Sequence, residues 1–564
     1  MIVELDVGIE MDDGVVLRAD VFRPRGESAS PVVLSLGPYG KGLSFQEGRA
    51  EAWRELVRLH PEVLEGSSNR YQCWEVADPE RWVPHGYACV RVDARGAGRS
   101  PGVLDPLSAR ETDDLYACVE WAGEAPWSTG RVGLLGVSYH AINQWQVACK
   151  HPPHLAAICP WEGGADHYRD LARHGGILSS FWSSWFERRV LPVQHGVGER
   201  GPRSAVSGEL VAGPETLTEN ELAAHRVDMA AAFREHDLDD EYYRERSPEL
   251  EKITVPLLSA ANWGGQGLHE RGNFDGFLRT SSTEKWLEVH GGSHWEEFST
   301  SYGVTLQRSF FDRFLHGADN GFGDGWRVQL RVRHIDRFVE RREQQWPLAR
   351  TVWTRLYLDP ASGELRRDVT VPSSASYDAL GTGLHLLTEP FASESEITGP
   401  VGAQLWVSTT AADADLFAVL RLFAPDGAEV VFRGAQDPRV PLTLGWLRLS
   451  QRDADAVTPE HQPRHPHRSR APVRADEVVR ADIELWPTSI VVPPGYRVGL
   501  TVRGRDYQIE EEADARGVAV RTMNGVGRCV HDDIRDRSEE RLAGVVTLYG
   551  GGDHRSVLVL PVVP

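Results

Sequence analysis

The sequence predicts a doubly wound α/β core that is interrupted by a helical segment and followed by an antiparallel β-domain. Three observations predict this organisation. Short apolar runs alternate with helical patterns up to residue 165, this rhythm stops and then returns, and the last part of the chain alternates apolar with polar residues. Short unbroken strands separated by helices are typical of a parallel sheet covered on both faces. A chain of 564 residues is also too long for a single core.

The core elements follow from the hydrophobic pattern. Five apolar runs predict strands at residues 14–22, 30–39, 86–96, 130–138 and 154–163. Residues 109–127 carry apolar positions at helical spacing and predict a helix between the third and fourth strands. The same rhythm returns with strands within 253–264 and 284–292 and a helix over 303–317. The core is therefore predicted in two parts, 1–165 and 251–330.

The segments 166–250 and 331–564 differ from the core in their residue patterns. Residues 166–250 mix aromatic clusters with charged stretches, and 219–246 read as helix, so we predict a helical cap inserted into the core. From residue 331 to residue 564, short alternating strands are separated by turn signals such as PDG and PPG, which predicts a β-sandwich of the jelly-roll type.

Composition excludes several classes of partner. The chain carries 61 basic and 82 acidic residues, a net charge of −21, which argues against nucleic acid and against anionic membranes. The N-terminal residues lack the features of a signal peptide, and no apolar run is long enough to span a membrane. The six cysteines are scattered without a C-x-x-C pair, so we expect free thiols in a reducing cytoplasm. The His-rich stretch 461–470 is interrupted by proline and arginine and predicts a loop, not a metal site.

One short stretch points to nucleophilic catalysis. The sequence GRVGLLGVSYHAINQWQ reads as a strand, a tight turn at Ser138 and a helix, which is how a hydrolase holds a nucleophilic serine on a strained elbow. The usual motif, G-x-S-x-G, has glycine two places after the serine, where this chain has His140. The turn alone therefore leaves open whether Ser138 is a working nucleophile.

A nucleophilic serine also needs a base and donors for an oxyanion. His294 follows the last predicted core strand and is better placed to reach Ser138 than His290, which ends that strand. The backbone N–H of Tyr139 is one oxyanion donor, and Tyr39, in the loop after an early strand, is the candidate for the second. The Gly96-x-Gly98 pair lacks the third glycine of a dinucleotide site, so we expect no cofactor.

Several of these stretches resemble one known family. The sequence is similar to the cocaine esterase and X-prolyl dipeptidyl-peptidase-like hydrolases, which include α-amino acid ester hydrolases, at GPYGK, DARGAGRSPG, GVSYHAINQWQ and ELWPTSIVVPPGYRVGLTV. The resemblance implies an α/β-hydrolase core with a helical cap and a C-terminal jelly-roll β-sandwich. It also implies an elbow of the form G-x-S-Y-x-G, in which Ala141 replaces the later glycine and a bulky residue at 140 is accepted. By this resemblance Ser138 is the nucleophile and His294 the base, and Tyr39 and the Tyr139 amide form the oxyanion hole.

The triad acid is where the chain departs from the resemblance. The family's aspartate position corresponds to Gly265, and glycine cannot orient an imidazole. Glu162 directly follows the strand after the nucleophile helix, and it is the best substitute because an acid at that sheet edge can reach the same imidazole. The alternatives are an enzyme without an acid or one of three other carboxylates: Asp166, Glu270 and Asp275.

The sequence therefore predicts a serine hydrolase that cleaves carboxylic esters, with amides as a second substrate type, through an acyl-enzyme and without metal or organic cofactor. Four cap residues at helical spacing could line the substrate pocket or simply pack: Phe181, Trp182, Trp185 and Phe186. The same two alternatives hold for Tyr168 and Trp263. Two alternatives are an X-Pro dipeptidyl peptidase and a non-catalytic binding protein on a hydrolase scaffold. We expect a small-molecule substrate, and the oligomeric state stays open, with a homo-oligomer as one outcome.

Overall fold

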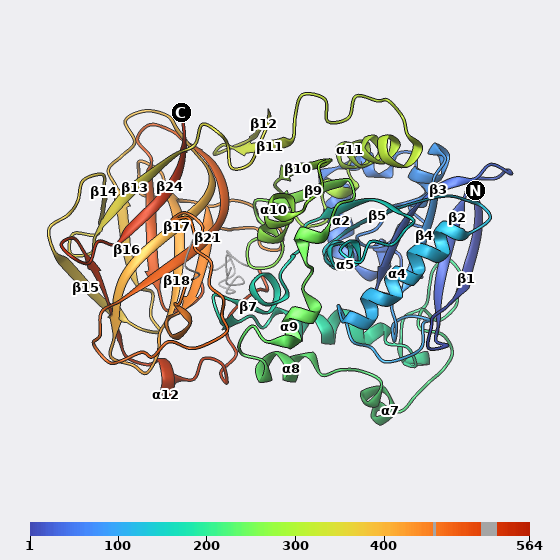
Figure 1. Cartoon of the computed structure of the whole chain (residues 1–564), viewed down its shortest axis with the longest axis horizontal. Helices are drawn as coiled ribbons and strands as arrows, with labels where there is room; N and C mark the ends of the chain where they lie inside the picture. Colours follow the sequence, from blue (N-terminus) through green and yellow to red (C-terminus); the bar gives the residue numbers. More distant parts are fainter. Residues whose placement is uncertain (455–457, 509–526) are drawn as a thin grey trace, which may run out of the picture.

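Two large sheets organise the chain. The computed structural model describes residues 1–454, 458–508 and 527–564. A mixed α/β body formed by the first part of the chain lies beside a strand-rich body formed by the last part, and the cap helices lie along the lower edge of the α/β body (Figure 1). The predicted α/β core with a separate C-terminal β-domain is thus confirmed.

The first sheet has ten strands in the order β1-β2-β4-β3-β5-β6-β9-β10-β11-β12. Its central strands from β4 to β11 run parallel, and the pairs β1–β2, β2–β4 and β11–β12 are antiparallel. The strands are β1 Ile2–Glu10, β2 Val16–Arg23, β3 Ser30–Gly37, β4 Ala88–Asp93, β5 Ser128–Val137, β6 Leu155–Trp161, β9 Leu257–Asn262, β10 Lys285–His290, β11 Val328–Arg333 and β12 Phe338–Glu343.

Helices cover this sheet because its strands are apolar on both faces. Every residue of β3 and β4 is buried, as a parallel strand between two helix layers requires. Side chains of Ser108 and Thr300 accept backbone N–H groups and so begin the helices at the predicted positions. The helices of this body are α1 Phe45–Gly48, α2 Ala50–Leu59, α3 Pro79–Trp82, α4 Ala109–Glu124, α5 Tyr139–Ala148, α10 Glu270–Arg279 and α11 Ser301–Phe311.

The cap is helical but more broken than predicted. Residues 219–246 form three short helices and not one continuous helix, which corrects the prediction. The physical reason is that side chains of Asp228 and Asp240 accept backbone N–H groups and start new helices inside the segment. A short strand pair also lies in the cap. Its elements are β7 Arg173–His174, β8 Ile177–Leu178, α6 Phe181–Trp185, α7 Glu219–Ala224, α8 Met229–Glu235 and α9 Glu241–Arg246.

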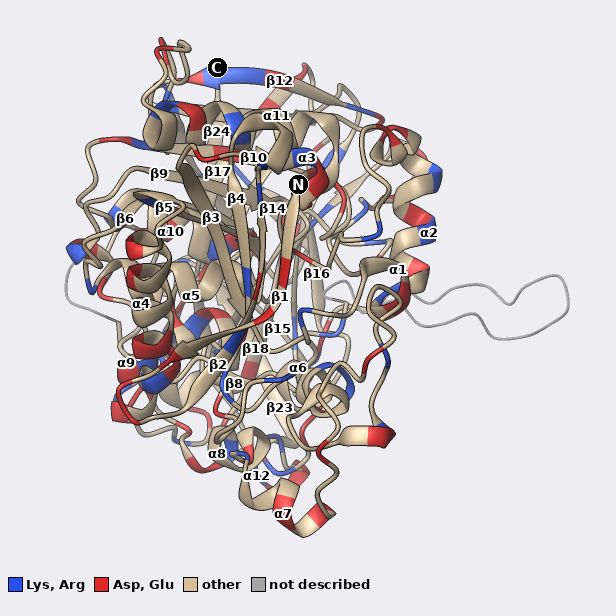
Figure 2. Cartoon of the chain, turned by 90° about the vertical axis from the view of Figure 1, so that its right-hand side faces the viewer, with Lys and Arg blue, Asp and Glu red and all other residues tan. Residues whose placement is uncertain are grey.

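Apolar packing and surface charge divide the cap into two faces. Inward-facing cap residues join one buried cluster with residues of the C-terminal body, among them Trp182, Trp446 and Trp486. This cluster accounts for part of the high tryptophan content and fixes the cap between the two bodies. Acidic residues mark the outer helices α7 and α9 (Figure 2).

The C-terminal strands form one continuous twelve-stranded sheet in place of two separate layers. Strand β24 pairs with β13 and also with β17, so the sheet closes on itself around a core of Leu, Ile and Val. Because β11 and β12 belong to the first sheet, that sheet extends beyond the predicted boundary at residue 330. The strands are β13 Val352–Asp359, β14 Glu364–Arg366, β15 Ser373–Asp378, β16 Leu384–Thr388, β17 Ser395–Thr409, β18 Asp415–Phe423, β19 Glu429–Val430, β20 Thr443–Arg448, β21 Val479–Val492, β22 Arg497–Arg503, β23 Val545–Gly550 and β24 Val557–Val563. A short helix, α12 Glu539–Leu542, precedes β23.

The cysteines and the helix lengths bear on two of the sequence predictions. The six cysteines all lie in the described part of the chain and are all free thiols. Among the described residues, no helix has both the length and the apolar character that crossing a membrane requires.

Candidate active site

Ser138 stands on a sharp turn between β5 and α5. Its backbone is at φ 60° and ψ −117°, a conformation that costs a non-glycine residue free energy and is found at nucleophile elbows. Its N–H donates to the carbonyl of Trp161 at 3.0 Å, which ties the turn to the neighbouring strand. The sequence signal for an elbow therefore corresponds to an elbow in the structure.

The neighbours of Ser138 explain how the turn closes without the usual glycine. The His140 ring is buried against Gly37 and contacts the Leu36 carbonyl through Nδ1 at 2.9 Å, so it lies beneath the Tyr39 loop. Ala141 is accommodated by Gly163 on the next strand's loop, where an added Cβ would come within 2.5 Å of the Ala141 Cβ. Gly163 thus supplies the space that a glycine at 141 would otherwise provide.

The hydroxyl of Ser138 contacts an imidazole that the sequence analysis did not select. Ser138 Oγ lies 3.0 Å from Nε2 of His269, which directly precedes α10. His269 is buried, and its Nδ1 has no hydrogen-bond partner among the described residues. The Ser138 contact predicted for His294 is therefore made by His269 in this structure. The reason is that Nε2 of His294 is held elsewhere.

His294 is held between two carboxylates. Its Nδ1 lies 2.8 Å from Glu162 Oε2, and its Nε2 lies 3.1 Å from Glu75 Oε1. The His294 and His269 rings are nearly parallel, at 12°, with centroids 5.0 Å apart. The contact between Glu162 and Nδ1 is the one that a triad acid makes with its histidine.

Glu162 also connects a second histidine to the site. Its Oε1 lies 3.1 Å from Nε2 of His290, and His290 Nδ1 lies 2.7 Å from Glu288. Burial would raise the pKa of Glu162, but the two histidines lower it to about 2. His290, at the end of β10, therefore contacts Glu162 on the oxygen that does not contact His294.

The two imidazoles nearest Ser138 have opposite charge states near neutral pH. Burial alone would lower the pKa of His294, but Glu162 and Glu75 raise it to about 10, so His294 is an imidazolium in this arrangement. Burial, and then the charge of His294, hold the pKa of His269 well below its usual value, so His269 is neutral. Each imidazole thus has one half of what a general base needs: His269 has the serine, and His294 has the acid.

The two residues predicted to supply oxyanion donors are Tyr39, which lines the same cleft as Ser138, and Tyr139, which follows the serine. Tyr139 is the first residue of α5, a position whose N–H has no acceptor within the helix. Tyr39 Oη accepts a hydrogen bond from Trp185 Nε1 at 3.1 Å, which leaves its O–H free to donate. Burial, with Glu75 as the second cause, raises the pKa of Tyr39, so the hydroxyl keeps its proton. The Tyr139 hydroxyl itself is taken up by Glu111 at 2.6 Å and serves the fold.

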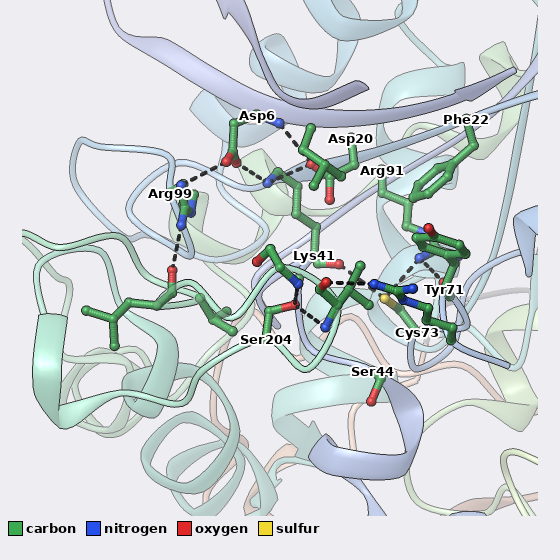
Figure 3. Close-up of a pocket in the computed structure, with 17 residues that line it drawn as sticks. Asp6, Asp20, Phe22, Lys41, Ser44, Tyr71, Cys73, Arg91, Arg99 and Ser204 are labelled. Atoms are coloured by element: carbon green, nitrogen blue, oxygen red, sulfur yellow. Dashed lines mark hydrogen bonds and ion pairs between the residues drawn. The ribbon is translucent and has the colours of Figure 1, made fainter. Parts of the chain in front are cut away.

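A network of ion pairs fixes the loop that carries Tyr39. Figure 3 shows a small hollow in which Lys41 reaches Asp6 at 2.6 Å and Asp20 at 3.0 Å. Asp93 accepts from the backbone N–H groups of Lys41 and Arg99, at 2.6 and 2.9 Å. These charges compensate one another, so we assign this hollow to loop bracing and not to substrate binding.

Ser138 lines a cleft. The cleft has a volume of about 440 Å³ and is lined by residues that include Ser138, Tyr39, Glu75 and His294. Of the six aromatic residues considered for the pocket, Phe181 and Trp185 line the cleft.

The other four aromatic residues pack away from the cleft, which corrects that prediction. Trp182 donates to the Leu171 carbonyl, Tyr168 to the Asp237 carbonyl and Trp263 to the Arg331 carbonyl. Phe186 is buried in the cluster that joins the cap to the C-terminal body. In each case the aromatic surface is used to join elements, the packing alternative stated above.

The competing carboxylates have other contacts. Asp166 caps the turn that follows it by accepting from the N–H of Arg169, and it also pairs with the Arg169 guanidinium at 2.9 Å. Asp275 pairs with Arg464 at 3.0 Å. Burial raises the pKa of Glu270 well above its usual value, so its carboxyl is neutral.

Two site residues were missed by the sequence analysis, His269 and Glu75. His269 lies in the loop GGQGLHERG, which contains the position of the expected acid, Gly265. A histidine just before a helix at this edge of the sheet is a sequence signal for a site residue. Glu75 comes from an irregular segment before α3 and has φ 64°, so no periodicity marks it. Nothing in the sequence brings it to His294.

Comparison with known proteins identifies the family. Residues 13–296 match the X-Pro dipeptidyl-peptidase (S15) family, and residues 320–559 match the X-Pro dipeptidyl-peptidase C-terminal non-catalytic domain. The chain belongs to the X-Pro dipeptidyl-peptidase (S15) family. The S15 match ends just after His294, so it includes Ser138, Glu162 and both histidines near the serine, His269 and His294.

Relatives of this S15-family chain span its whole length. Cocaine esterase of Rhodococcus sp. (strain MB1 Bresler) is 26% identical over 641 residues, covering 99% of this chain and 98% of the relative. A CocE/NonD family hydrolase from Staphylococcus aureus has a solved structure that is 32% identical, with a TM-score of 0.83 and coverage of 100% of this chain and 94% of that one. A solved α-amino acid ester hydrolase, 16% identical with a TM-score of 0.65 and coverage of 100% and 96%, shares the fold. The chain is a serine hydrolase of esters or peptides.

Proposed function

We propose that this S15-family chain is a carboxylic ester hydrolase in which Ser138 attacks the ester carbonyl and forms an acyl-enzyme. The observation that carries the proposal is the hydroxyl of Ser138, on a strained elbow, 3.0 Å from an imidazole nitrogen and open to a cleft of about 440 Å³. A serine with no catalytic task has no need of this backbone conformation.

His294 is the general base and Glu162 its orienting acid. A base that becomes an imidazolium needs a carboxylate on Nδ1, and of the two imidazoles near Ser138 only His294 has one, at 2.8 Å. His269 holds the serine hydroxyl in the resting state. In the reaction the Nε2 proton of His294 passes to the Glu75 carboxylate, 3.1 Å away. The neutral Nε2 then turns to Ser138, takes the hydroxyl proton and later donates it to the leaving group.

Tyr39 and the Tyr139 backbone N–H stabilise the oxyanion of the tetrahedral intermediate. Donors placed where charge develops contribute more in a buried site than in water. The indole of Trp185 donates to Tyr39 Oη and so strengthens the Tyr39 O–H as a donor. Deacylation repeats the sequence with water as the nucleophile.

Ester hydrolysis is favoured over release of X-Pro dipeptides by the lining of the cleft. A dipeptidyl peptidase needs a carboxylate to hold the substrate ammonium group. The described cap residues that line the cleft are Phe181, Ser184, Trp185 and Arg189, none of which is acidic. Glu75, which lines the cleft together with Ser138, is engaged with His294.

Two measurements test the proposal. A fluorophosphonate probe should label one peptide, the one containing Ser138, and Ser138→Ala should abolish labelling. A panel of p-nitrophenyl acyl esters should be cleaved faster than Gly-Pro-p-nitroanilide. Preference for the anilide would make the protein a dipeptidyl peptidase, and absence of labelling in the folded protein would leave only a binding function.

We add four further expectations to this function. Jelly-roll connectivity in the C-terminal body is supported by its long antiparallel strands, and a cytoplasmic location by the free thiols. A small-molecule substrate, without nucleic-acid or membrane partners, is supported by the net charge of −21. A homo-oligomer is to be tested by the mass in solution.

A further inference from the structure

Two arginine side chains in the cleft have no acidic partner. Arg49 precedes α2, Arg189 comes from the cap, and both line the cleft with Ser138. Across the described residues, neither guanidinium lies within ion-pair distance of a carboxylate. In a protein with 82 acidic residues against 61 basic ones, two uncompensated cations in one cleft require an explanation.

Aromatic rings, and not a carboxylate, contact the guanidinium of Arg49. Its guanidinium carbon lies 5.0 Å from the Trp74 ring centroid and 5.6 Å from the ring centroid of Tyr39. Among the described residues, the guanidinium of Arg49 makes a single hydrogen bond, to the Gly48 carbonyl at 2.8 Å. A guanidinium has five N–H donors, so most of those of Arg49 remain available to a ligand. The contact with Tyr39 puts this cation next to the proposed oxyanion donor.

The two cations also repel each other. Burial, and then the charge of Arg189, lower the pKa of Arg49 to about 10. Such an arrangement costs free energy in the empty cleft, and an anion bound between the two groups would recover it. Arg528 lines the same cleft.

The carboxylates of the cleft do not neutralise these arginines. Glu55 pairs with Arg433 at 2.8 Å, and Glu75 contacts His294 at 3.1 Å. The remaining one, Glu51, is exposed to solvent at the start of α2. The cleft therefore keeps unneutralised positive charge at Arg49 and Arg189, within reach of the reacting serine.

We propose that the substrates are esters that carry a carboxylate, which Arg49 and Arg189 bind while Ser138 attacks the ester carbonyl. The inference rests on the proposed ester hydrolase function and adds the class of substrate to it. Arginine is suited to this task because its planar guanidinium matches a carboxylate with two parallel hydrogen bonds. Neutral esters of the same shape lack this contact and bind less well.

Matched ester pairs test the proposal. On the acyl side, p-nitrophenyl hydrogen glutarate is compared with p-nitrophenyl pentanoate, and on the alcohol side 4-acetoxybenzoate is compared with its methyl ester. The wild-type ratio of kcat/KM, anionic over neutral, should exceed ten in at least one pair. Arg49→Gln and Arg189→Gln should each lower that ratio about ten- to a hundredfold, mainly through KM.

Two exposed arginines next to these positions provide controls. Arg54→Gln on α2 and Arg188→Gln in the cap remove the same charge outside the cleft and should leave the ratio as it is in the wild type. Ratios near one in both wild-type pairs, or equal effects of the cleft and control variants, would overturn the proposal.

Binding separates this inference from the ester hydrolase proposal. Calorimetry of Ser138→Ala with monomethyl glutarate measures anion binding without any turnover. Binding that is lost in the Arg189→Gln background supports the anion site even if no ester is cleaved. Neutral-ester hydrolysis combined with no binding of monomethyl glutarate removes the anion site and leaves the hydrolase intact.

Discussion

Replacing Glu75 with glutamine tests how the proton-accepting imidazole is controlled. Glu75 Oε1 lies 3.1 Å from His294 Nε2, and together with Glu162 it raises the pKa of His294 to about 10. Glutamine keeps the shape of the side chain but removes its charge. The variant should therefore lower the pKa of His294 and release its Nε2 for Ser138.

The size of the shift can be estimated from the geometry. An opposite charge at this distance shifts a pKa by ~1–3 units, so the acid limb of kcat/KM should move from about 10 to roughly 7–9. Each unit corresponds to about 1.36 kcal/mol of interaction with the charged form. Because the base must be neutral, a lower pKa raises the fraction of active enzyme, and kcat/KM near neutral pH should rise about tenfold or more.

The assay is the pH profile of kcat/KM with p-nitrophenyl pentanoate, which reports the free enzyme. Glu51→Gln is the matched control, because it removes an exposed charge from the rim of the same cleft without touching His294. Its acid limb should coincide with that of the wild type. An unmoved acid limb in Glu75→Gln would refute the reasoning, since His294 would then not be the group whose titration limits the rate.

Four further outcomes follow from the same contacts. Glu162→Gln should lower the acylation rate by up to ~10⁴-fold, as loss of a triad acid does, whereas Asp166→Asn should change it little; equal losses would remove Glu162 from the mechanism. Tyr39→Phe should lower kcat by ~10²–10³-fold with a small change in KM, and an unchanged kcat would assign the oxyanion to other donors. Gly163→Ala places a methyl group within 2.5 Å of the Ala141 Cβ and should cost about 1–3 kcal/mol in denaturant unfolding; no loss would mean that the elbow is less tightly packed than described. The pKa of His290 is raised to about 10, so its stabilising contribution is complete below its unfolded pKa and is lost as the pH rises through about 10; urea midpoints that stay constant across that range would contradict the contacts made by this side chain.

The parts of the site that could be predicted are those set by strand ends. Ser138, Glu162 and His294 each follow a buried parallel strand, and the carboxyl ends of neighbouring parallel strands meet at one edge of the sheet. This geometry is enough to pair Glu162 with His294 although 132 positions separate them. The same reasoning predicts Tyr39, in the loop after β3.

The parts that could not be predicted depend on irregular backbone. Glu75 reaches His294 from a segment without periodicity, 219 positions away, and its conformation at φ 64° has no sequence signature. His269 was not predicted because its loop, around Gly265, was expected to supply the acid and not a histidine. Trp263 packs in one cluster with Val491 and Val563, and the Tyr168 hydroxyl contacts Gln451, so the packing of both rings depends on where the C-terminal body docks, which no local pattern reports.

The fold shows the same division. The central strands β2 to β6, β9 and β10 and the helices α4, α5 and α11 were predicted because their apolar periodicity is strong, whereas β1, β11, β12 and α10 were not predicted. The cap helix over 219–246 was predicted as one element, since its composition is helical throughout and the interruptions depend on two aspartate side chains. Closure of the C-terminal sheet depends on the β17–β24 pairing, which joins strands at opposite ends of that domain.

Comparing His294→Gln with His269→Gln tests most directly which imidazole activates Ser138. The measurement is the rate of Ser138 acylation by a fluorophosphonate probe, with thermal unfolding used to verify that both variants are folded. Our account predicts that His294→Gln loses ~10⁴-fold in rate and that His269→Gln retains activity within about tenfold of the wild type. The opposite order, with His269 indispensable and His294 replaceable, would make His269 the base and would contradict the role given to the His294–Glu162 pair.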